Sequence, residues 1–139
     1  MVSSRDKDSV RAQKNIQLEW ETIGPNLFIL LNYFGEWTWE EHDERIDHAL
    51  QLVHDAQAPA FIAFNLRENS YMPPGGFAAH MRYTLQAFST TPLLQGAIYI
   101  MMSSPLNALI TTAYNTYAPE VPVYFAHSID EAADIAANS

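Results

Sequence analysis

Histidine and carboxylate side chains are the groups in this sequence that could transfer protons or bind a metal ion. The five histidines are His42, His48, His54, His80 and His127. The acidic side chains clustered around the first of them are Glu36, Glu40, Glu41, Asp43, Glu44 and Asp47. A catalytic acid needs a desolvated pocket that raises its pKa, and a metal site needs several converging ligands. Helical spacing instead puts these carboxylates on the outer face of one helix, so we predict a solvated acidic face, with no metal site and no catalytic residue.

Two pairs on this helix, Glu44 with His48 and Glu41 with Arg45, are spaced i,i+4 and are predicted to be surface ion pairs. The sequence contains no H-E-x-x-H, G-x-S-x-G or G-x-x-x-x-G-K-[ST] motif and no cysteine. These motifs would indicate a zinc protease, a serine hydrolase or a nucleotide-binding loop, and a cysteine is needed for a thiol enzyme. We therefore expect a protein that is not an enzyme and that uses no cofactor.

Gly75 and Gly76 form a glycine pair where a helix is predicted to begin. Backbone N–H groups at such a position can bind an anion, which makes Arg67, His80 and Arg82 candidate anion or ligand contacts. The alternative is that the glycines only allow a tight turn and close packing of the helix.

Charge is distributed unevenly along the 139 residues, whose formal net charge is −9. Four of the seven basic residues lie within residues 1–14, beside two aspartates, so the remainder carries three arginines against fourteen carboxylates. Such a surface repels phosphate groups and argues against nucleic acid and anionic membrane as partners. The apolar runs are too short to insert into a membrane. We predict a flexible polar tail at 1–14, a single domain at 15–139 and a cytoplasmic location.

Hydrophobic spacing predicts the order of the secondary-structure elements. Ile16, Leu18 and Trp20 alternate with polar residues, as in a half-buried strand, and a second strand is predicted at 27–34. Thr38 and Glu41 form a capping box for a helix at about 38–55. The elements predicted after it are a strand at 61–64, a helix opening at Gly75-Gly76, a strand at 97–102, a helix beginning at Ser104-Pro105, a strand at 121–125 and a helix capped by Ser128. The order ββαβαβαβα predicts an α/β fold, in which an N-terminal hairpin precedes alternating helices and mostly parallel strands.

The segment Tyr71-Met72-Pro73-Pro74 follows the predicted central strand at 61–64. Ligands of open α/β sheets gather at the carboxyl ends of the strands, and loops held there by a rigid scaffold often carry function. The segment is therefore predicted either to be a contact surface or to fold back as a lid over the core.

Three segments resemble the STAS domain family of anti-sigma factor antagonists. Leu30-Leu31-Asn32-Tyr33-Phe34-Gly35 is similar to that family's strand-then-glycine approach to the first helix. Residues 64–77 resemble its central segment, in which Asp-Leu ends a strand and Asp-Ser-Ser-Gly opens the next helix. Tyr124-Phe125-Ala126-His127-Ser128-Ile129-Asp130-Glu131-Ala132 is similar to its closing strand and capped helix. The resemblance implies a STAS-like fold and a binding role in signalling.

The resemblance also implies which residues bind a partner and which of the family's residues are replaced in this chain. Asn65 occupies the position of the first Asp, and Pro73 that of the second. Pro74 and Gly75 occupy the two serine positions, so we expect no phosphorylation there; Ser70 lies upstream. The implied partner-binding residues are Ser70, Tyr71, Met72, Pro73, Pro74, Gly75, Gly76 and Phe77.

The sequence thus predicts a non-enzymatic, STAS-like binding or regulatory domain. Its expected partner is a protein, either an anti-sigma-type kinase or another signalling protein. The prediction also allows the chain to form a homodimer. The alternative is a carrier or sensor of a small apolar, lipid-like ligand, held between the sheet and the helices that begin near Gly76 and Ser104.

Overall fold

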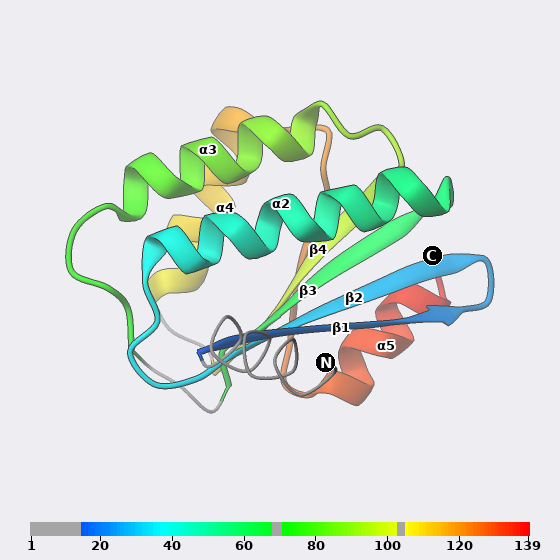
Figure 1. Cartoon of the computed structure of the whole chain (residues 1–139), viewed down its shortest axis with the longest axis horizontal. Helices are drawn as coiled ribbons and strands as arrows, with labels where there is room; N and C mark the ends of the chain where they lie inside the picture. The colour runs from blue at the N-terminus through cyan, green and yellow to red at the C-terminus, as the bar shows by residue number, and fades with distance from the viewer. Residues whose placement is uncertain (1–14, 68–70, 103–104) are drawn as a thin grey trace, which may run out of the picture.

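The computed structural model describes residues 15–67, 71–102 and 105–139. The elements follow the predicted order, as Figure 1 shows. They are β1 (Ile16–Ile23), β2 (Asn26–Tyr33), α2 (Trp39–Ala56), β3 (Ala60–Asn65), α3 (Phe77–Ser89), β4 (Leu94–Ile100), α4 (Pro105–Tyr117), β5 (Val123–Ala126) and α5 (Ile129–Ala137). Ser70 and Ser104, which the sequence suggested as a partner contact and a helix cap, lie outside the described residues.

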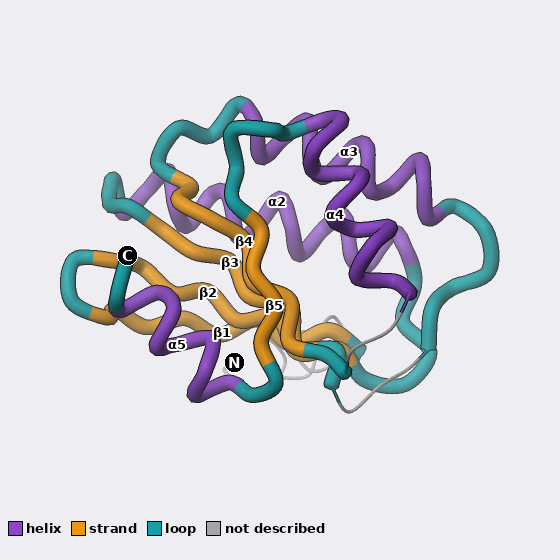
Figure 2. Tube along the Cα trace, turned by 180° about the vertical axis from the view of Figure 1, so that it is seen from behind, coloured by secondary structure: helices purple, strands orange, loops and turns teal. Residues whose placement is uncertain are grey.

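The five strands form one sheet in the order β1-β2-β3-β4-β5. β1 pairs antiparallel with β2, and every other neighbouring pair is parallel, which confirms the predicted hairpin and α/β class. A right-handed crossover between parallel strands that follow sequence order puts every crossover helix on the same face of the sheet. Accordingly α2, α3 and α4 cover one face, and among the described helices α5 is the one that lies on the other (Figures 1 and 2).

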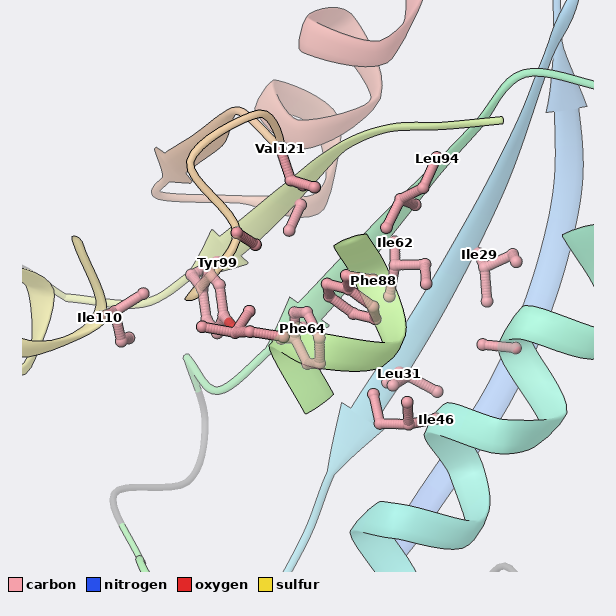
Figure 3. Close-up of a cluster of buried hydrophobic side chains, with 14 of the residues drawn as sticks. Ile29, Leu31, Ile46, Ile62, Phe64, Phe88, Leu94, Tyr99, Ile110 and Val121 are labelled. Carbon is pink, nitrogen blue, oxygen red and sulfur yellow. The ribbon is translucent and has the colours of Figure 1, made fainter. Parts of the chain in front are cut away.

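The larger part of the core lies between the sheet and the three crossover helices. Strand β2 is buried along its whole length, and its alternate residues face opposite sides of the sheet. Ile29 and Leu31 point toward the crossover helices, where they join Ile46 of α2, Ile62 and Phe64 (Figure 3). This packing positions the carboxyl ends of β2, β3 and β4 beneath the first turns of α2, α3 and α4.

A smaller core lies under α5. Phe28, Leu30 and Phe61 point to this face and pack with Ala132 and Ala136 of α5. The small alanine side chains let the helix approach the sheet closely. The Asn26 side-chain amide donates a hydrogen bond of 2.8 Å to the Ala136 carbonyl, which ties the end of α5 to the start of β2.

Two predictions about α2 are wrong, because the helix lies against the edge strand. Arg45 is buried rather than part of a surface pair: its Nε donates to the Ile16 carbonyl at 2.8 Å, and its guanidinium also contacts Glu44. Glu41 is half-buried and accepts from the backbone N–H groups of Asn15 and Ile16. These side chains satisfy backbone groups at the start of β1, so the face of α2 is not uniformly solvated.

Trp20 also differs from the alternating pattern, since its side chain is 56% exposed although Ile16 is buried. β1 lies at the edge of the described sheet, and the burial of its alternate residues falls from Ile16 through Leu18 to Trp20.

Candidate functional site

A small apolar cavity, here called the inner pocket, lies at the carboxyl ends of the three central strands. Tyr33, Phe64 and Tyr99 project into it from β2, β3 and β4. The other residues that line it are Trp37, Trp39, His42, Leu66, Met72, Phe77, Met81, Leu106 and Ile110. Its volume is about 30 Å³, close to the share of one water molecule in the liquid. Side chains therefore almost fill the inner pocket.

The polar side-chain atoms around the inner pocket form hydrogen bonds with one another or with neighbouring side chains. The Tyr33 hydroxyl lies 2.7 Å from Nδ1 of His42, and Nε2 of His42 lies 3.2 Å from the Thr84 hydroxyl. Burial, assisted by His80, lowers the pKa of His42 to about 3, so its imidazole is neutral at physiological pH. The Tyr99 and Tyr114 hydroxyls lie 2.9 Å apart, and burial raises the pKa of both. The inner pocket thus presents an uncharged, internally hydrogen-bonded wall.

A second hollow, here called the outer groove, opens beside the inner pocket. Trp37 and Trp39 line both cavities. The remaining residues of the outer groove are Glu36, Thr38, Glu40, Tyr71, Pro73, Pro74 and His80. Its volume is about 600 Å³, within the range of roughly 300–1,000 Å³ usual for ligand sites. Unlike the inner pocket, the outer groove has room for a ligand or a peptide segment.

The two tryptophans hold the loop at 71–76 in place. The indole N–H of Trp37 donates to the Tyr71 carbonyl at 3.2 Å, and that of Trp39 donates to the Gly75 carbonyl at 2.8 Å. Gly76 has a φ of +81°, and a Cβ there would lie 3.0 Å from the Trp39 ring. A left-handed backbone pressed against an indole requires glycine, so the geometry supports the structural interpretation of the glycine pair.

A histidine–carboxylate pair lies along the outer groove. Nδ1 of His80 is 2.9 Å from Oδ2 of Asp43, and the imidazole stacks on the Trp39 ring with centroids 5.0 Å apart. Burial raises the pKa of Asp43, although His80 acts in the opposite direction. Oδ1 of Asp43 is buried and has no hydrogen-bond partner among the described residues. The prediction that every acidic residue of α2 faces solvent is therefore wrong for Asp43, because α3 packs over it.

The predicted partner-binding segment divides between the two cavities. Tyr71, Pro73 and Pro74 line the outer groove, whereas Met72 and Phe77 line the inner pocket. Tyr71, Met72 and Phe77 are half-buried and Pro73 is buried, whereas Pro74, Gly75 and Gly76 are exposed. Its residues thus contribute both to a lid over the core and to an accessible surface.

The three candidate anion contacts have different neighbours. His80 bonds to Asp43, as described above. Arg82 is exposed, and its guanidinium carbon lies 5.9 Å from the centre of the Tyr117 ring on α4. Arg67 is exposed after β3, where its backbone N–H donates to the Asn65 side chain. Neither arginine lines the outer groove.

The part of the chain that the structure describes holds no group of three or more histidine, aspartate or glutamate side chains able to bind a metal ion. None of its helices has the length and apolar character needed to cross a bilayer.

Comparisons of this chain with models of protein families, with curated proteins and with solved structures found no significant match. Membership of the STAS family therefore stays a prediction from the residues that carry the resemblance.

Proposed function

We propose that this chain is a non-enzymatic binding domain that takes a segment of a protein partner in the outer groove. The observation that carries the proposal is an open groove of about 600 Å³ at the carboxyl edge of the sheet, one wall of which is the loop at 71–76. The resemblance to STAS domains singles out this same loop, and it supports a regulatory role with a signalling protein as partner.

The composition of the outer groove supports binding rather than chemistry. Tryptophan and tyrosine are enriched among the residues that dominate the affinity of protein interfaces, and the groove offers Trp37, Trp39 and Tyr71. The two indole–carbonyl hydrogen bonds and the two prolines hold the loop, so less entropy is lost when a partner docks. The hydroxyl and imidazole groups of the neighbouring inner pocket are neutral and bonded to one another.

Tyr71→Ala is expected to weaken the complex about thirty-fold, equivalent to ~2 kcal/mol, by removing an aromatic contact from the groove wall. Partner recovery in a pull-down would be measured beside a thermal melt of each variant. Trp20→Ala is the matched control, because Trp20 is an exposed aromatic residue outside the groove. A lower melting temperature with unchanged partner recovery would show that Tyr71 serves only as a lid.

A second candidate function is the carriage of a small apolar ligand in the inner pocket. The lining, which is almost wholly apolar and aromatic, favours it. Because the cavity holds only about 30 Å³, a ligand would have to displace a lining side chain such as that of Met72, which is half-buried and whose long thioether chain is flexible.

Native mass spectrometry of the purified chain would test this second function. A carrier is expected to retain a co-purified apolar molecule, visible as added mass that is lost on denaturation. A native mass equal to that of the polypeptide, unchanged after incubation with decanol or decanoate, would contradict it.

A further inference from the structure

The described chain begins at the rim of the outer groove. The backbone N–H groups of Asn15 and Ile16 both donate to Oε2 of Glu41, at 3.2 and 3.0 Å. The side-chain amide of Asn15 lies 3.5 Å from the carbonyl of Glu36, a residue of the groove wall. These contacts fix the point at which residues 1–14 join the domain.

The outer groove is acidic. Glu36 and Glu40 line it, and Asp43 lies behind His80. Among the described residues that line it there is neither lysine nor arginine. Its tryptophan and tyrosine rings can also attract cations, since an ammonium or guanidinium over an aromatic face is stabilised by the ring quadrupole. A basic peptide is therefore the segment that the charges and rings of the groove fit.

Residues 1–14 have the complementary composition. Four of the seven basic residues of the chain lie there, against two aspartates, whereas the remaining residues carry a net charge of −11. The basic residues are Arg5, Lys7, Arg11 and Lys14. Fourteen residues reach up to ~46–50 Å when extended, far more than the groove requires. Attachment at the rim also gives the segment an effective concentration in the groove of the order of millimolar, so that even weak contacts are populated.

We infer that residues 1–14 occupy the outer groove of the free protein and compete there with the partner. This inference rests on the proposed function, because the groove that the segment covers is the proposed partner site. A partner must then displace a tethered basic segment, and its apparent affinity is reduced by the fraction of molecules in which the groove is covered.

The absence of cysteine from the chain allows a contact probe at a single position. Bimane attached to Ser9→Cys, in the full chain with Trp20→Phe as background, reports contact with Trp37 and Trp39 through quenching of its fluorescence. Strong quenching is expected at low salt, with recovery of about two-fold or more at about 0.5 M salt, where charges are screened.

Glu36→Gln/Glu40→Gln is expected to release the quenching at low salt. Glu21→Gln/Glu120→Gln removes the same charge from exposed residues outside the groove and should leave it unchanged. Two results would overturn the inference. One is unquenched bimane fluorescence at low salt in the labelled protein that keeps Glu36 and Glu40, and the other is equal quenching in the two double variants.

The result is separable from that for the proposed function. If the probe is quenched as expected but partner recovery does not respond to Tyr71→Ala, the segment docks in the groove and the partner binds elsewhere. If Tyr71→Ala weakens the complex but the bimane fluorescence is not quenched, the partner binds in the outer groove and residues 1–14 do not compete with it.

Discussion

Acidification from pH 7 to pH 4.5 is expected to lower the free energy of unfolding by about 2–3 kcal/mol through His42 alone. In the unfolded chain this imidazole takes up a proton near pH 6.5, whereas burial lowers the pKa of His42 in the folded protein to about 3. Between these values the unfolded state binds more protons, so acid favours unfolding. The contribution is complete above pH 6.5 and is lost progressively toward pH 3, by about 1.4 kcal/mol per pH unit.

Urea unfolding of the wild type and of His42→Gln at several pH values would measure this contribution. The variant has no titrating group at this position, so its stability should fall less steeply below pH 6.5. His127→Gln is the control, because it makes the same replacement at an exposed histidine outside the core. Parallel curves for wild type and His42→Gln would mean that the imidazole is already solvated in the folded protein.

Phe64→Ala is expected to cost about 3–5 kcal/mol, as for other buried aromatic residues replaced by alanine. The Phe64 ring is 2% exposed and stacks on Tyr99, with the two centroids 4.5 Å apart and the planes 10° from parallel. It also contacts Phe88, so removing the ring loses packing contacts that join β3 to both β4 and α3. Phe125→Ala, at a half-buried site on the edge strand β5, should cost less.

Chemical denaturation of the two variants gives the comparison. Because Phe64 lines the inner pocket, the alanine variant also gains an apolar cavity, and benzene is expected to raise its melting temperature as it fills the space. A loss for Phe64→Ala no larger than that for Phe125→Ala would mean that the pocket collapses onto the missing ring.

Local signals explain why the fold could be predicted from the sequence. The hydroxyls of Thr38 and Ser128 accept from the backbone N–H groups of Glu41 and Glu131, as the spacing of the two capping boxes predicted. The continuous apolar run at 61–64 lies within the buried strand β3. Such signals span a few residues, so they survive in a single sequence.

The site depends on contacts between distant residues, which no local pattern records. The indole groups of Trp37 and Trp39 reach carbonyls 34 and 36 residues away. The Asp43–His80 pair joins α2 to α3 across 37 residues. The aromatic content of Trp37-Thr38-Trp39, directly before a helix, was the available signal for the groove wall. The burial of Arg45 depends on the nearness of β1 to α2, which helical spacing does not reveal.

The position of α5, on the face of the sheet opposite the other described helices, affects how the native state opens. Nine residues of largely small side chains hold it there, together with the hydrogen bond from Asn26 to Ala136. It is the shortest of the described helices, and its buried residues are the two alanines Ala132 and Ala136, which bury little apolar surface. Amides of α5 are therefore expected to exchange with solvent through local opening, whereas those of β2 and β3 exchange through global unfolding. Each such opening removes the contacts of α5 with Phe28, Leu30 and Phe61 while the sheet stays intact, and at high concentration we expect aggregation to begin at these apolar side chains.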